Sequence, residues 1–184
     1  MSRLAALVLL ATAVPASAAH WTVDPARSRI GFSANWLGKV VPGSFRKWSA
    51  AIDFDVAVPG KAAIAVNVDL ASATTGDKTV DSALPGEDWF AVAAGPQARF
   101  VATRVVASGP GRFVATGTLT IKGRAVPVTL PFTLVIAGDV ATMDGRAQFD
   151  RRAWKLGLES DATAEYVAFA VPIAVHVVAR RTAK

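Results

Sequence analysis

The chain has 184 residues, a formal net charge of +6 and no cysteine, and hydrophobic residues make up 52% of it. This length suits one domain with enough core to fold alone, and the lack of cysteine excludes disulfides and thiol chemistry. Its basic residues are scattered as pairs, such as Arg46-Lys47 and Arg151-Arg152, and form no dense basic stripe. We therefore expect no nucleic-acid partner.

The first residues have the pattern of a signal peptide. A basic start at Arg3 is followed by a charge-free apolar run, LAALVLLATAV, and by the small residues Ala16-Ser17-Ala18. This order is typical of export signals, and the run is shorter than the roughly 20 residues that cross a bilayer. We expect cleavage after Ala18 or Ala19, which makes residues 1–19 a signal peptide and places the mature protein in the periplasm.

Apolar and polar residues alternate along most of the mature chain, which predicts strands with one buried face. In chain order, the alternating runs cover residues 30–36, 48–54, 63–70, 100–106, 113–121, 126–136, 141–149 and 169–177. Turn residues such as Gly109-Pro110-Gly111 and Lys122-Gly123-Arg124 separate several runs, so consecutive strands should pair antiparallel. Eight such strands either close into a barrel or stack as a sandwich, because free edges invite aggregation. We favour an all-β, eight-stranded antiparallel up-and-down barrel.

The alternation stops between Ala71 and Pro96, where small, polar and turn residues take over. The stretch from Asp77 to Leu84 predicts one or two helical turns, which Pro85-Gly86 would end. Irregular segments of this length are often functional. We expect this one to form a short helical segment that covers one mouth of the barrel.

Few residues could carry catalysis or hold a metal. Of two histidines, His20 lies near the mature N-terminus, where we expect a mobile side chain, and His176 lies in the last strand on its outward face. The sequence has no Gly-x-Ser-x-Gly turn and no phosphate-binding loop. We therefore expect no enzymatic activity, no catalytic residue, no metal site and no cofactor.

Carboxylates gather in the irregular segment, at Asp77, Asp81, Glu87 and Asp88. Paired acids could act as general acid and base or hold calcium, but their spacing matches no calcium loop. A structural role is favoured instead. We expect Asp77 and Asp81 at a helix N-terminus, and Asp88 as the cap of the turn entered by Trp89-Phe90.

Aromatic residues are the most informative set, with five Trp and nine Phe against one Tyr. They fall mainly on the faces that we turn inward, where they would either fill a core or line a ligand cavity. Small inward residues among them, such as Ala50, Ala115 and Gly117, would leave room for a ligand in a barrel of this size. The candidate ligand-binding residues at the barrel lining and mouth are Phe32, Trp36, Phe45, Trp48, Phe54, Trp89, Phe90, Phe100, Phe113, Ala115, Gly117, Phe132, Phe149, Trp154 and Phe169.

Segments along nearly all of the mature chain follow a family pattern in order. They are Val23-Asp24-Pro25, Ser28 to Ser33, Gly43-Ser44-Phe45, Ile52 to Asp55, Asp81 to Phe90, Thr116 to Gly123 with Pro127-Val128, and Phe149 to Trp154. In this order they resemble the YceI-like family of exported, lipocalin-like proteins that bind polyisoprenoids. The resemblance implies that residues 20–184 form a lipid-binding β-barrel domain, whose function is to carry an isoprenoid lipid or quinone.

Departures from the family pattern bear on the ligand and the partner. Trp36, Val80, Ala83 and Pro85 stand where many members have His or Arg near the mouth. The resemblance therefore favours an apolar chain or quinone over a pyrophosphate-bearing ligand.

The residues leave a second interpretation open. The chain could be a filled-core accessory or interaction protein of a membrane b-type cytochrome or respiratory system, because Leu84 to Phe90 resembles members associated with such cytochromes. Peripheral contact with a membrane also remains open. So does the oligomeric state, for which a homodimer is one option.

Overall fold

A computed structural model describes residues 19–182. The expected signal peptide therefore lies, apart from Ala19, outside the described residues. The strands are β1 (Ala19–Val23), β2 (Arg29–Trp36), β3 (Lys39–Phe45), β4 (Trp48–Phe54), β5 (Ala63–Asp69), β6 (Ala73–Thr74), β7 (Gln97–Gly109), β8 (Arg112–Ile121), β9 (Arg124–Ala137), β10 (Val140–Asp150) and β11 (Ala170–Thr182). The helices are α1 (Lys78–Ala83) and the 3-10 turns η1 (Pro25–Arg27), η2 (Pro59–Lys61), η3 (Leu70–Ser72) and η4 (Arg151–Trp154).

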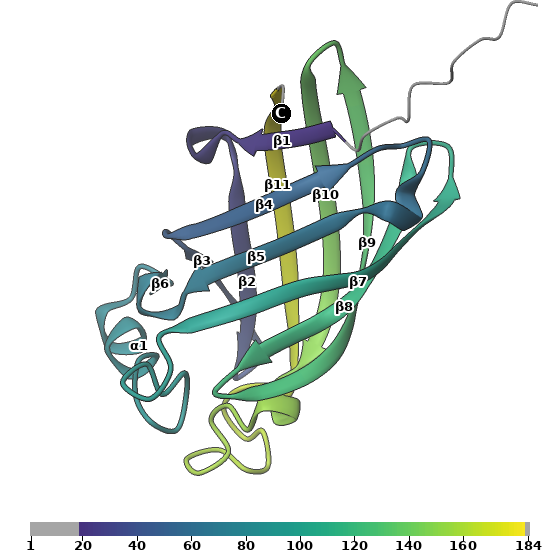
Figure 1. Ribbon diagram of the computed structural model, residues 1–184. Helices are drawn as coiled ribbons and strands as arrows, with labels where there is room; N and C mark the ends of the chain where they lie inside the picture. The colour runs from purple at the N-terminus through teal and green to yellow at the C-terminus, as the bar shows by residue number, and fades with distance from the viewer. Residues whose placement is uncertain (1–18, 183–184) are drawn as a thin grey trace, which may run out of the picture.

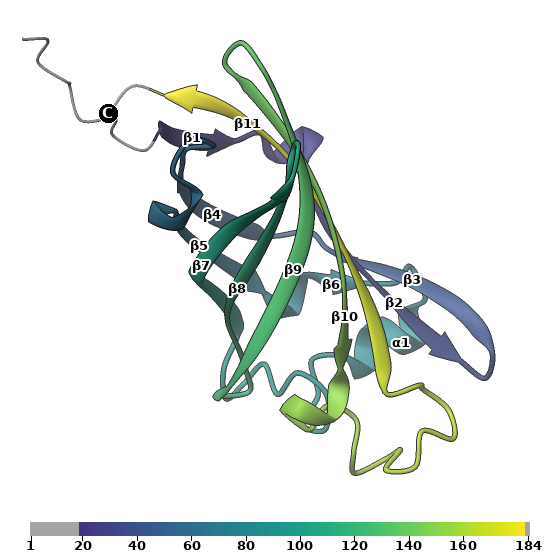
Figure 2. The same ribbon diagram turned by 90° about the vertical axis from the view of Figure 1, so that its right-hand side faces the viewer.

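The sheet closes on itself through the order β1-β4-β5-β7-β8-β9-β10-β11, because β11 pairs with β1. All of these pairs are antiparallel. The expected eight-stranded antiparallel barrel is confirmed, and Figures 1 and 2 show its strands wrapping around one interior. Closure leaves no long free edge within this ring.

At two of the eight strand positions around the barrel, the chain forms two consecutive strands instead of one: β1 with β2, and β3 with β4. β1 and β2 pair in turn with the same strand, at Val23↔Ala179 and at Phe32↔Ile173 of β11. Their partners β4 and β3 are likewise consecutive. The first break is stabilised by Asp24, whose carboxylate accepts hydrogen bonds from the backbone N–H groups of Ala26 and Arg27 at the start of η1.

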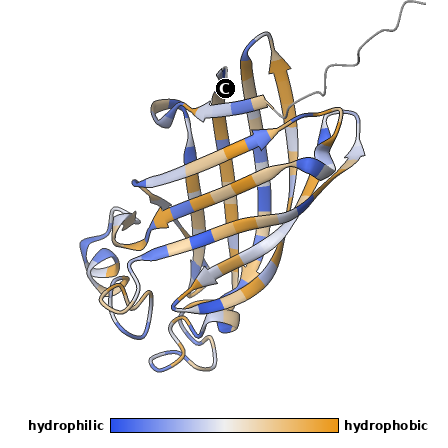
Figure 3. Ribbon diagram, viewed as in Figure 1, coloured by the Kyte–Doolittle hydropathy of each residue, from blue (hydrophilic) through white to orange (hydrophobic). Residues whose placement is uncertain are grey.

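Figure 3 shows hydrophobic and hydrophilic residues alternating along the strands, as the sequence predicts. The side chains of Leu119, Val128, Phe132 and Val171 face the interior, and Phe113 is buried within it. One end of the barrel is filled with side chains. There the Phe113 ring meets the Phe54 ring edge-on, with 5.4 Å between centroids, and stacks on Phe132 at 5.5 Å.

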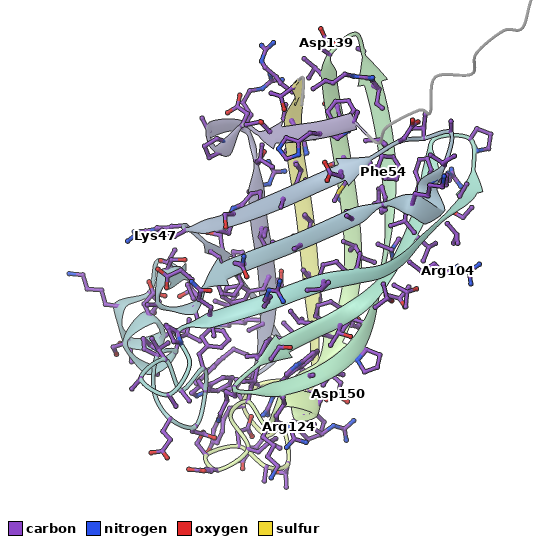
Figure 4. The ribbon with its side chains drawn as sticks, in the orientation of Figure 1. Lys47, Phe54, Arg104, Arg124, Asp139 and Asp150 are labelled. Atoms are coloured by element: carbon purple, nitrogen blue, oxygen red, sulfur yellow. The ribbon has the colours of Figure 1, made fainter. Side chains whose placement is uncertain are left out.

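Trp21 completes this closed end. It is only 3% exposed, and its indole N–H donates to the carbonyl oxygen of Phe54 at 3.0 Å. In Figure 4, Asp139 lies at this closed end of the molecule, whereas Arg124 and Asp150 lie near the opposite end. That opposite end is covered by α1 and by the connection from η4 to β11 (Figure 1).

Within residues 19–182, no helix is both long and apolar enough to cross a membrane.

Candidate ligand cavity

The barrel encloses a cavity of about 1030 Å³. Inward side chains from every strand of the closed ring line it. Many of them, such as Val66 on β5, Leu130 on β9 and Ile173 on β11, are only half-buried although they face the interior. An inward residue keeps accessible surface when no side chain packs opposite to it. The interior is therefore open rather than filled, and its volume is that of a small-molecule site.

Most of the residues that the sequence nominates lie on this cavity. The lining includes Phe32, Trp36, Phe45, Trp48, Phe54, Trp89, Phe90, Phe100, Ala115, Phe132, Phe149 and Trp154. Their contact with a ligand remains a prediction, but the structure brings them around one space.

Three nominated residues lie outside the lining. Phe113 is packed between other rings at the closed end. A Cβ added to Gly117 would lie 2.3 Å from the carbonyl oxygen of Val101 and 2.6 Å from the Phe100 ring, so the space beside this glycine is already taken. Phe169 precedes β11 and packs against the guanidinium groups of Arg151 and Arg152, at 5.0 and 4.3 Å from its centroid.

Polar groups reach the cavity only at its mouth. Those in the lining come from the segment entering α1, at Thr75, Asp77 and Thr79, and from the segment that begins with η4. The latter contributes Arg151, Ser160, Asp161 and Tyr166. The rest of the lining is apolar, so a ligand would place a polar end at the mouth and an apolar body inside.

The helix at the mouth is capped as the sequence predicts. The Asp77 carboxylate accepts hydrogen bonds from the backbone N–H groups of Thr79 and Val80 at 2.8 and 3.2 Å. Asp81 lies in the first turn, but its carboxylate reaches back to the Thr74 hydroxyl at 2.6 Å and to the Thr75 backbone N–H at 2.6 Å. Asp81 thereby ties α1 to β6 and fixes the position of the helix over the mouth.

These bonds make the Asp81 tie sensitive to acid. The hydrogen bonds from Thr74 and Thr75 lower the pKa of Asp81 from 3.8 to about 2. Because folding lowers this pKa, the stabilisation is complete above pH 3.8 and is lost as the pH falls through about 2. We expect the gap in Tm between the wild type and Asp81→Asn to shrink over that range in thermal unfolding at stepwise lower pH. Asp139→Asn, at the closed end, is the control, and a gap that stays constant with pH would contradict the assignment.

Asp88 joins the two segments of the mouth. Its carboxylate accepts hydrogen bonds from the backbone N–H groups of Glu159 and Ser160, at 2.9 and 3.1 Å, and from the Ser160 hydroxyl. Partial burial acts to raise the pKa of Asp88, but the bonds from Ser160 and Glu159 outweigh it and the pKa is lowered. The expected capping of the turn at Trp89-Phe90 is wrong, because the carboxylate points across to the other segment instead.

Arg151 is the residue at the mouth whose role the sequence does not reveal. Its side chain is 1% exposed and pairs with Asp161, with 2.9 Å between Nη2 and Oδ2. The guanidinium also donates to the carbonyl oxygens of Leu156, Gly157 and Val167. All three of its nitrogens are thus engaged within the protein, and they hold the connection after η4 in place.

Asp161 is fixed equally firmly from its other side. Its carboxylate accepts hydrogen bonds from the backbone N–H groups of Glu165, Tyr166 and Val167. Burial acts to raise the pKa of Asp161, but these N–H groups and the charge of Arg151 outweigh it, and the pKa is lowered. The pair therefore stays ionised and anchors the loop that carries Tyr166 to the rim.

The two histidines lie away from the cavity. His20 is in β1, where its Nδ1 lies 2.9 Å from an oxygen of Asp53, so the expected mobile side chain is wrong. The Nδ1 of His176 lies 2.7 Å from an oxygen of Asp144, in a groove on the outer wall. Its outward orientation is confirmed.

Residues 21–179 match the family described as YceI-like domain. The chain belongs to this family. A UPF0312 protein of Shewanella denitrificans is 34% identical over 132 residues, which cover 70% of this chain and 68% of that protein. The resemblance noted in the sequence is thus confirmed.

Solved structures share the fold of this YceI-like chain. BcnA of Burkholderia cenocepacia is 34% identical and superimposes with a TM-score of 0.82, over 85% of this chain and 98% of BcnA. A polyisoprenoid binding domain from Saccharophagus degradans is 13% identical, with a TM-score of 0.70 over 89% of this chain and 99% of that domain. At that identity the likeness to the second structure shows the fold alone.

Proposed function

We propose that this chain is an exported, non-enzymatic carrier that binds an isoprenoid lipid or quinone inside its barrel. The observation that carries the proposal is the open apolar cavity of about 1030 Å³ with its polar groups confined to the mouth. Burial of each five-carbon isoprene unit would contribute about 3–4 kcal/mol of gross stabilisation. A few units therefore suffice for tight binding once ordering costs are met. The S. degradans domain, which has the same fold and is named for polyisoprenoid binding, supports this ligand class.

The mouth favours a neutral headgroup over a pyrophosphate. The Arg151 guanidinium donates to backbone carbonyls and to Asp161, which leaves it no free face toward a ligand. The other charged groups in the lining, Asp77 and Asp161, are acidic and would repel an anion. The neutral Thr79 and Tyr166 side chains also reach the lining, and their hydroxyls suit a quinone carbonyl or an alcohol.

The accessory-protein interpretation required a filled core, and the open interior does not fit it. Binding of an apolar ligand inside the barrel requires no cofactor or metal. The proposed setting is the periplasm, where the pattern of residues 1–19 would direct the chain.

Native mass spectrometry of protein purified from the periplasm without detergent tests the proposal. We expect an adduct whose mass, after organic extraction, matches an isoprenoid alcohol or a quinone. Delipidated protein should then take up a quinone with a short isoprenoid tail at one site per chain. Absence of any adduct, together with no uptake by delipidated protein, would contradict the carrier function.

A further inference from the structure

An exposed apolar patch stands at the rim of the cavity. We define this rim patch as Trp36, Leu37, Val40 and Tyr166, which are 43%, 62%, 71% and 43% exposed. Among the described residues, only Val56 and Val135 are further large hydrophobic side chains with comparable exposure. Four of these six exposed side chains therefore lie on the tip of the β2–β3 hairpin and the loop beside it, and exposed apolar residues that cluster in this way mark an interaction surface.

Contacts between the β2–β3 hairpin and the connection that precedes β11 hold three of these residues together, while Val40 pairs with Asn35 on the outer face of the hairpin. The Trp36 and Tyr166 rings lie 6.2 Å apart, and the Leu37 backbone N–H donates to the Tyr166 carbonyl oxygen at 2.9 Å. Trp36 also pairs with Val167 in an isolated bridge. The patch is thus part of the ordered mouth, anchored through the Arg151–Asp161 pair.

The residue at the hairpin tip does not serve the stability of the turn. Leu37 and Gly38 form a two-residue turn and have φ values of +48° and +83°. Such turns favour Asn or Gly at the first position, because other side chains are strained at positive φ. A leucine there is strained at positive φ, and because it is 62% exposed it gains little from burial in return. A favourable interaction of the Leu37 side chain with a binding partner would account for its presence at this position.

The rim patch is continuous with the cavity. The side chains of Trp36 and Tyr166 belong to the cavity lining and are also exposed on the outside. Figure 2 shows the β2–β3 hairpin projecting beyond the barrel wall. A surface into which the hairpin is pressed would therefore lie directly at the cavity mouth.

We propose that the rim patch docks on a lipid bilayer, with Leu37 and Val40 among the acyl chains and the cavity mouth open to the membrane. Trp and Tyr favour the headgroup level, where an apolar ring and a polar atom are both accommodated. Lys39, exposed at the same tip, can reach lipid phosphates, and the mature chain, with 19 Lys and Arg against 14 Asp and Glu, has a net charge of about +5 that favours an anionic surface.

A second copy of the chain fits this tip less well than a bilayer does. A stable interface between proteins engages about 20–30 residues on each side. The rim patch offers four apolar side chains on a projecting hairpin and its neighbouring loop. Insertion into a bilayer needs only a few such side chains.

Flotation with vesicles of phosphatidylethanolamine and phosphatidylglycerol tests the docking. We expect the mature wild-type protein to float with the vesicles. The partition coefficient of the double variant Leu37→Asn/Val40→Thr between vesicles and water should be at least about tenfold lower. Asn tolerates positive φ, so the Tm of the double variant should equal or exceed that of the wild type. Val135→Thr, which changes a 66% exposed valine at the closed end, is the matched control and should float like the wild type.

Equal flotation of the double variant and the wild type would overturn the proposal. So would a wild-type dimer that the double variant abolishes in analytical ultracentrifugation, because the patch would then be an interface between copies. This proposal rests on the carrier function, because a cavity mouth that opens to the membrane matters only if the barrel takes up a lipid. The same samples are therefore extracted for bound isoprenoid or quinone. Flotation that depends on Leu37 and Val40, with no extracted ligand and no quinone uptake by delipidated protein, would leave the docking in place and refute the carrier function.

Discussion

Replacement of Arg151 by Leu is expected to lower the free energy of unfolding by about 3–5 kcal/mol, the cost of removing one partner of a buried ion pair. The variant would leave the Asp161 carboxylate without its cation and the carbonyl oxygens of Leu156 and Gly157 without the Nη1 donor. Because the guanidinium also lies over the rings of Trp89 and Phe169, the packing of the mouth would loosen as well. For a chain of this size, the Tm should fall by about 10 °C.

The neighbouring arginine provides a matched control. Arg152 also lies over the Phe169 ring, but its side chain is 56% exposed and pairs with the half-exposed Asp150. Surface pairs contribute little, so Arg152→Leu should keep its Tm within about 2 °C of the wild type. Urea unfolding of the three proteins measures the difference. Similar losses in both variants would show that the buried pair does not anchor the mouth.

The barrel could be predicted from the sequence because alternation is a local signal. Strands such as β8 and β9 alternate strictly, and their inward residues follow from the pattern alone. The strand β3 could not be found in this way, since Pro42-Gly43 interrupts it and Val40-Val41 breaks the alternation. It is extended because β2 supplies a continuous set of partners, and that pairing appears only in the folded chain.

Alternation predicts which side of the sheet a residue takes, but not what lies opposite to it. Phe113 and Phe132 share a face and are cross-strand partners, yet Phe113 is not in the cavity lining and Phe132 is. The Val101 carbonyl oxygen and the Phe100 ring occupy the space beside Gly117, next to the register shift between Ala102 and Arg104 in the β7–β8 ladder. Such shifts and the height of a residue along the barrel depend on distant strands.

The buried arginine escaped prediction for a similar reason. Arg151 and Arg152 are adjacent in the sequence and chemically identical, and only the course of the loop after η4 decides which one is enclosed. Asp161, the partner of Arg151, is ten residues away in an irregular segment. The stretch from Phe149 to Trp154 supports the family assignment, but its pattern does not show which arginine is buried as an anchor and which lies at the surface.

Enlarging Ala50 is expected to abolish or strongly weaken ligand binding while leaving the fold intact. Ala50 lies on β4, lines the cavity and is only half-buried, so a phenylalanine ring at this position would extend into open space. It would displace about one isoprene unit of the ligand, and the Kd for a short-tailed quinone should rise at least about tenfold. In a filled core the same change would overpack the interior and destabilise it by about 1–3 kcal/mol.

The adjacent residue separates these outcomes. Ala51 is exposed on the outward face of the same strand, so Ala51→Phe adds the same bulk outside the barrel. Quinone titration followed by tryptophan fluorescence, together with Tm values of delipidated protein, compares the wild type with both variants. We expect weak binding and a nearly unchanged Tm for Ala50→Phe, and wild-type binding for Ala51→Phe. Undiminished binding by Ala50→Phe would place the ligand elsewhere than in the cavity, because a ring at this position and a bound isoprenoid chain would compete for the same space.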